Sequence, residues 1–150
     1  MKLIQLFSKS TNESDNNSTV RPKRNNLELI VDYGIKDDKF AGKDSDRAIM
    51  IVPTIAYDIL EENNISLEYG SLGENLLVDC NIMDSKIGTL VKIGNIVLEI
   101  TQKCTICNHL ATFDKQIPSL IKDYRGVYCK IIKGGILYNT MDIINLGEQA

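Results

Sequence analysis

The residues with the clearest chemical potential are two cysteines, Cys104 and Cys107, in the segment Gln-Lys-Cys-Thr-Ile-Cys-Asn-His. This spacing brings two thiols, or two soft metal ligands, within reach of each other. Lys103 precedes the pair, and a neighbouring positive charge favours the thiolate, which is the nucleophilic and metal-binding form of cysteine. His109, the only histidine of the chain, follows two residues after Cys107 and could serve as a base, a ligand or a structural side chain.

The cysteine pair by itself is compatible with several chemistries. A closed zinc site needs four ligands, so the pair would have to recruit others from Cys80, Cys129 and His109. A thioredoxin-like dithiol normally opens a helix in a β-α-β setting, which the surrounding β-rich sequence does not offer. The third chemistry is a thiolate that binds a softer transition metal or carries a persulfide sulfur. Two buried structural thiols are the plain alternative to all three.

The segment that leads to the cysteines is predicted to be a β-strand. Ile96, Leu98 and Ile100 alternate with more polar residues, as expected when one face of a strand is buried. Residues 127–131 repeat this period, with Cys129 on the apolar face. Short apolar runs at 27–31 and 48–52 predict further strands.

Two helices and several turns complete the predicted elements. Pro53 and Thr54 predict the start of a helix that ends at residues 63–64, and a second, short helix is predicted around 118–124. Glycines at closely spaced positions predict the turns of a β meander or barrel. The expected fold is a mostly β (β-rich α+β) domain with a few short helices, in which short strands close a barrel.

Length and composition set the class of protein. The 150 residues predict one domain, and the net charge of -3 argues against an electrostatic nucleic-acid binder. No apolar run approaches the ~20 residues that span a bilayer, and the first residues lack the core of a signal peptide. We therefore expect no membrane association, a cytoplasmic location and cysteines that are thiols or ligands.

A polar segment near the start is predicted to be a mobile loop over about residues 8–26. Nine of the twelve residues from Ser8 to Thr19 are Ser, Thr or Asn, which offer little apolar surface to offset the entropy of ordering. The basic cluster at 21–24, Arg-Pro-Lys-Arg, is interpreted as the solvated end of this loop.

Four segments in order resemble the MOSC domain, named after the C-terminal domain of molybdenum cofactor sulfurases. Residues 34–42 with Arg47 are similar to the family's Gly-Ile-x-Gly-Asp-Arg-His-Ala-Gly and its downstream Arg. Residues 73–76 resemble its Gly-Glu-Asn turn, and residues 93–102 resemble the strand that leads to its cysteine. Residues 125–142 resemble its closing Arg-Gly, strand, Gly-Gly and Gly-Asp.

The resemblance implies a β-barrel and a cysteine that binds molybdenum or carries sulfur. In the branch with the mitochondrial amidoxime-reducing component, the second cysteine of such a pair binds the molybdenum of a pterin cofactor, and the enzyme reduces N-hydroxylated compounds. Cys107 inherits this role as the catalytic residue and the metal ligand. A separate electron- or sulfur-donor protein is implied as a partner. The cofactor-binding residues implied by position are Asp38, Lys39, Arg47, Asn75, Thr105 and Arg125.

The chain also departs from the family pattern. Asp37 stands in place of a Gly, Lys39 of an Arg, Phe40 of a His and Met141 of a Gly. Lys39 keeps the charge but lacks the bidentate fork that suits phosphate. These changes leave open whether the protein is an enzyme, and the alternatives are a non-catalytic accessory domain with a vacated cofactor site or a zinc-binding domain that uses the CxxC pair.

Overall fold

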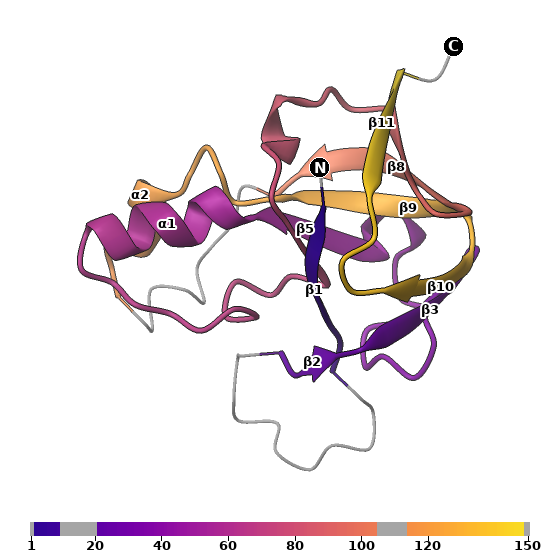
Figure 1. Ribbon diagram of the computed structural model, residues 1–150, viewed down its shortest axis with the longest axis horizontal. Coiled ribbons are helices and arrows are strands. Elements are labelled where there is room, and N and C mark those ends of the chain that lie inside the picture. Colours follow the sequence, from indigo (N-terminus) through magenta and orange to yellow (C-terminus); the bar gives the residue numbers. More distant parts are fainter. Residues whose placement is uncertain (1, 10–20, 105–113, 149–150) are drawn as a thin grey trace.

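The protein is described by a computed structural model over residues 2–9, 21–104 and 114–148. Most of its elements are strands, arranged in one large mixed sheet and one small sheet, with two helices at one end of the molecule (Figure 1). The large sheet has the order β11-β7-β8-β9-β5-β6-β1-β2, and the small sheet has the order β10-β3-β4. The strands are β1 (Leu3–Phe7), β2 (Lys23–Arg24), β3 (Asn26–Ile30), β4 (Gly34–Ile35), β5 (Ile49–Pro53), β6 (Leu76–Val78), β7 (Thr89–Ile93), β8 (Ile96–Lys103), β9 (Val127–Lys133), β10 (Gly135–Tyr138) and β11 (Ile143–Glu148); the helices are α1 (Thr54–Glu62) and α2 (Ile117–Leu120), with 3-10 turns η1 (Ser45–Arg47) and η2 (Ile82–Asp84).

The centre of the large sheet is formed by β5 and β6, which run parallel to each other. Every residue of both strands is buried, because apolar side chains cover both faces. Ile49 and Ile51 join the core cluster on one face of β5, while Met50 and Val52 join a second cluster on the other. A continuous apolar run is what a strand covered on both sides requires.

The second core cluster lies under α1. Ala56, Tyr57 and Leu60 are buried, and they pack with Phe7 and Ile117 among others. The prediction of this helix is confirmed, since Pro53 precedes its first residue and Asn63 caps its end. The second helix is shorter than expected, because only residues 117–120 are helical.

The strand before the cysteine pair is also confirmed. Ile96, Leu98 and Ile100 of β8 are buried, while the residues between them are partly exposed. β8 pairs antiparallel with β9, whose Cys129 lies fully buried in the first core cluster. Burial raises the pKa of Cys129, as expected of a core thiol.

Among the described residues, the two ends of the large sheet are joined by a single β-bridge and not by a full pair of strands. Lys2 forms an isolated antiparallel bridge with Asp142, just before β11, which lies at the far end of the sheet from β1. The backbone N–H of Leu3 donates to the carbonyl of Met141 at 2.9 Å. The described part of the fold is therefore mostly β, as expected. The pairings of its strands do not include the pair that would close a barrel.

The expected polar loop falls largely on residues 10–20, which lie outside the described residues. Its predicted end at residue 26 is too late. Lys23 and Arg24 form β2, which pairs with β1 through Phe7 and Leu6, and β3 begins at Asn26.

Candidate functional site

Asp38 organises the loop that follows β4. Its side chain is 6% exposed. One carboxylate oxygen accepts the N–H of Lys9 at 3.0 Å, and the other accepts the N–H of Phe40 at 3.0 Å. A carboxylate held by two backbone donors fixes its loop, so Asp38 positions the residues after it.

Three cations surround the ring of Phe40, which this loop presents at the surface. The Arg21 guanidinium carbon lies 4.8 Å from the ring centroid, and the ammonium nitrogens of Lys39 and Lys43 lie at 5.8 and 5.7 Å. These distances are within the range of cation–π attraction. Arg21 is half-buried, which corrects its interpretation as part of a solvated loop end.

Arg125 is the most deeply buried cation of the described residues. It is 2% exposed, and its Nε and Nη1 have no hydrogen-bond partner in the part of the chain that the structure describes. It lies at the turn before β9, where the carbonyl of Gly126 accepts the N–H of Cys104 at 2.9 Å. A buried guanidinium with unpaired donors is costly unless an anion or acceptor joins it.

Glu74 and Tyr57 form a buried hydrogen-bonded pair beside this arginine. The Tyr57 hydroxyl donates to Oε2 of Glu74 at 2.6 Å and accepts the N–H groups of Gly70 and Leu72. Burial raises the pKa of Glu74, while the Tyr57 hydrogen bond and Arg125 act in the opposite direction. Burial, followed by the charge of Glu74, raises the pKa of Tyr57.

Tyr128 connects the cysteine segment to Arg47. Its hydroxyl lies 3.8 Å from the sulfur of Cys104, and the Arg47 guanidinium carbon lies 5.5 Å from its ring centroid. Thr101 holds η1 in place, since its hydroxyl contacts the carbonyls of both Asp46 and Tyr128. Burial, followed by Cys104, raises the pKa of Tyr128, so its hydroxyl keeps its proton at neutral pH.

The side chain of Asn75 forms hydrogen bonds with the backbone of two strands. Its Oδ1 accepts the N–H of Met50 at 2.9 Å, and its Nδ2 donates to the carbonyl of Phe7 at 3.3 Å. Asn75 thereby ties β5 and β1 to the start of β6. Both ends of its amide contact backbone, which is the arrangement of a positioning residue.

Electrostatic interactions join these residues into one site. Arg21 interacts with Asp38, Glu74, Tyr128 and Arg125, and burial lowers its pKa while Asp38 acts to raise it. The structure thus links the predicted residues Asp38, Lys39, Arg47 and Arg125 through cation–π contacts and electrostatic interactions, and we call this group the basic site. It also adds Arg21, Glu74, Tyr57 and Tyr128, which the sequence analysis did not select.

The structure describes the cysteine segment as far as Cys104. Thr105 and Cys107, with His109, lie outside the described residues. Cys104, at the end of β8, is 5% exposed and belongs to the cluster under α1, whereas Cys129 belongs to the other cluster. Within residues 2–9, 21–104 and 114–148, no group of three His, Cys, Asp or Glu side chains could hold a metal ion.

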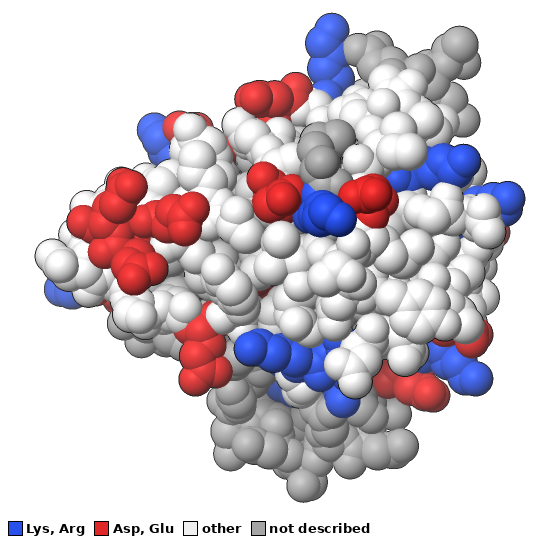
Figure 2. Space-filling view, in the orientation of Figure 1, with Lys and Arg blue, Asp and Glu red and all other residues white. Residues whose placement is uncertain are grey.

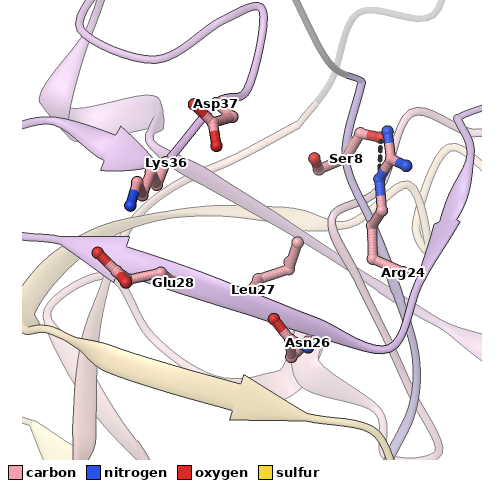
Figure 3. Close-up of a pocket in the computed structure, with 7 residues that line it drawn as sticks. All are labelled: Ser8, Arg24, Asn26, Leu27, Glu28, Lys36 and Asp37. Atoms are coloured by element: carbon pink, nitrogen blue, oxygen red, sulfur yellow. Dashed lines mark hydrogen bonds between the residues drawn. The ribbon is translucent and has the colours of Figure 1, made fainter.

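A separate pocket of about 480 Å³ lies between β3 and the loop after β4 (Figure 3). Glu28 and Lys36 line one side, and Arg24 donates from Nε to the carbonyl of Ser8 at 3.2 Å on the other. None of the described residues that line it was predicted as a site residue, although Asp37 is one of the departures from the family pattern. The pocket carries charges of both signs, and none of the described residues that line it belongs to the basic site.

Comparison with known protein families matches residues 37–149 to the MOSC domain. The chain belongs to the MOSC family. The match begins after Arg21, so this residue of the basic site lies outside the matched segment. A search of curated proteins found no match.

Solved structures have the same fold as this MOSC domain. YiiM from Geobacillus stearothermophilus has a TM-score of 0.76 at 15% identity, over 97% of this chain and 75% of that one. YuaD from Bacillus subtilis has a TM-score of 0.71 at 18% identity, over 95% and 93%. YiiM from Escherichia coli has a TM-score of 0.65 at 16% identity, over 96% and 70%. At these identities the likeness establishes the fold alone.

Among the described helices of this MOSC domain, none has the length and apolar character needed to cross a membrane.

Proposed function

We propose that this MOSC domain binds a molybdenum-pterin cofactor, with Cys107 as the molybdenum ligand and the basic site as the holder of its phosphate. The observation that carries the proposal is the guanidinium of Arg125, buried with two nitrogens that have no hydrogen-bond partner among the described residues. A phosphate oxygen would satisfy these donors and offset the cost of their burial.

The donor set suits this cofactor chemically. A thiolate is a soft ligand of the kind that transition metals prefer, and planar guanidinium groups match phosphate oxygens. Arg47 adds positive charge beside Tyr128, on which Arg125 also acts, and Lys39 adds it at the Phe40 ring, beside Arg21. Asp38 and Asn75 would act by fixing the loop and strands, while Thr105 could donate a hydrogen bond beside Cys107. The bound cofactor would supply a centre that exchanges two electrons with a substrate.

The proposed activity is the reduction of small N-hydroxylated compounds. Converting an N–OH group to N–H consumes two electrons and two protons and releases one water. A separate electron-carrier protein would supply the electrons. Tyr128 can donate a hydrogen bond to the substrate, because its hydroxyl stays protonated and lies at the Cys104 end of the site. Sulfur transfer from a persulfide on Cys107 is the alternative use of the same cysteine.

A non-catalytic accessory domain is the second candidate, and Phe40 favours it. Phe40 cannot transfer protons as the histidine of the family pattern could. A zinc site built on Cys104 and Cys107 is a third. We also propose that the strands close a barrel and that the protein is cytoplasmic, since cysteines stay reduced in the cytoplasm.

Elemental analysis tests the proposal. Protein purified from a molybdenum-replete host should contain stoichiometric molybdenum, and Cys107→Ser should lose it. Cys80→Ser is the matched control, since Cys80 packs beside the first core cluster and should leave the metal content unchanged. Arg125→Met should lower molybdenum and phosphate content together, with circular dichroism as the test of folding.

Each other result counts against the proposal. Stoichiometric zinc that is lost on chelation with unfolding would identify a structural zinc domain. Absence of both metals, with no persulfide mass on Cys107, would identify an accessory domain.

A further inference from the structure

We propose that Phe40, Arg21, Lys39 and Lys43 form a binding site for an aromatic phosphate, a small molecule with a phosphate attached to a flat ring. Binding of this ligand does not depend on the proposed function, but its role as a substrate rests on that function. The four residues are called the Phe40 site below.

The first observation is a surplus of positive charge without ion pairs. Arg21, Lys39 and Lys43 each have a cationic group within 6 Å of one ring centroid. None of them forms an ion pair with a carboxylate among the described residues, in contrast to Arg47, whose Nε lies 3.7 Å from Asp44. Cations gathered in this way repel one another, and a dianion such as phosphate would reduce that repulsion.

The two carboxylates that interact with Arg21 already accept hydrogen bonds from other groups. Asp38 interacts with Arg21, but both of its oxygens accept backbone N–H groups. Glu74 also interacts with Arg21, but its Oε2 accepts hydrogen bonds from the Tyr57 hydroxyl and the N–H of Gly70. Three cations face two carboxylates, which leaves a local surplus of positive charge although the whole chain carries -3.

The second observation is the exposed ring itself. Phe40 is 46% exposed, yet its loop is fixed by hydrogen bonds on both sides. The N–H of Lys39 donates to the carbonyl of Lys9 at 2.7 Å, and the N–H of Gly42 donates to the carbonyl of Tyr33 at 2.6 Å. A fixed, exposed aromatic ring offers apolar and stacking contact to a second ring.

The two observations together specify the ligand class. Inorganic phosphate would use the cations but not the ring, and an uncharged aromatic compound would use the ring but not the cations. A molecule that carries both groups gains both contributions, and a dianionic phosphate suits three cations better than a monoanionic carboxylate. Charge also separates this region from α1, over which acidic side chains gather at one end of the molecule (Figure 2).

Titration of the metal-free protein with three probes tests the inference. At low ionic strength, 1-naphthyl phosphate should bind more tightly than 1-naphthol and than inorganic phosphate, as measured by calorimetry. Lys43→Ala should weaken naphthyl phosphate binding about two- to fivefold, the effect expected of one exposed charge interaction. Phe40→Ala should remove the preference for naphthyl phosphate over inorganic phosphate.

Lys92→Ala is the control, because Lys92 is an exposed lysine on β7. It should leave binding unchanged. Equal binding of naphthyl phosphate and either simpler probe would overturn the inference, as would an equal loss in Lys92→Ala and Lys43→Ala. Because the titration needs no molybdenum, a protein that binds naphthyl phosphate but no molybdenum would refute the proposed function alone.

Discussion

Glu74 is a fully buried residue of the site, and burial opposes the ionisation of its carboxyl group. Only Oε2 has hydrogen-bond partners among the described residues, namely the Tyr57 hydroxyl and the N–H of Gly70. Burial disfavours the charged carboxylate, and this effect outweighs the hydrogen bonds and the attraction of Arg125, so the pKa is raised. Folding therefore shifts Glu74 toward its protonated form.

We predict that Glu74→Gln weakens the dependence of stability on pH. Because its pKa is raised on folding, Glu74 binds more protons in the folded state than in the unfolded state above an ordinary carboxyl pKa of ~4.3. Its contribution to stability is therefore full at low pH and is lost as pH rises through the raised pKa. Glutamine cannot ionise, so the variant should gain stability relative to the parent protein between about pH 4 and 8.

Urea denaturation across this pH range measures the effect. Glu61→Gln, which changes an exposed carboxyl on α1, is the control and should leave the pH dependence unchanged. Parallel curves for the parent protein and Glu74→Gln would contradict the prediction.

At the scale of elements, the turn before β9 decides where Arg125 and Cys104 lie. Gly126 has a φ of +117°, a conformation that residues with a side chain rarely adopt. A Cβ atom at this position would lie 2.5 Å from the carbonyl oxygen of Ile51 on the neighbouring strand. The close approach of β5 and β9 therefore requires glycine here.

Gly126→Ala should lower the free energy of unfolding by about 2–4 kcal/mol, from backbone strain and the steric clash together. Gly88→Ala separates the two causes, because Gly88 has a φ of +92° but no atom within 4 Å of its added Cβ. It should cost only about 1–2 kcal/mol. Chemical denaturation measures both, and equal losses in the two variants would show that the clash contributes nothing.

At the scale of the whole molecule, two core clusters share the same central strands. The side chains of β5 and β6 alternate between the cluster inside the large sheet and the cluster under α1. Neither cluster can lose its packing without exposing the other face of β5. The two clusters should therefore unfold together.

Leu98→Ala and Leu60→Ala test this coupling from opposite sides. Both leucines are 0% exposed, and each substitution should lower the free energy of unfolding by about 2–5 kcal/mol. Far-UV circular dichroism follows the sheets, while tyrosine fluorescence follows the cluster under α1, which holds Tyr57, Tyr124 and Tyr128. The two signals should give the same midpoint in both variants. Separate midpoints in Leu60→Ala would contradict the prediction.

Patterns within a few residues predicted the local elements. Pro53 and Thr54 predicted the start of α1, and the alternation of Ile96, Leu98 and Ile100 predicted β8, because helix starts and strand periods are properties of neighbouring residues. The order of four short motifs predicted the family, and the match over residues 37–149 agrees with it.

The contents of the site depended on contacts between distant segments. Arg21 reaches Phe40 from a segment 19 residues earlier, Tyr57 meets Glu74 from α1, and Asn75 bonds to β1 and β5. No local pattern separates Arg21 from Lys23 in the cluster Arg-Pro-Lys-Arg, yet one is half-buried and the other exposed. The residue types and periods of the sequence determined which elements form; only long-range strand pairing and burial decided which charges meet, because a side chain's desolvation and its partners are set by neighbours that are remote along the chain.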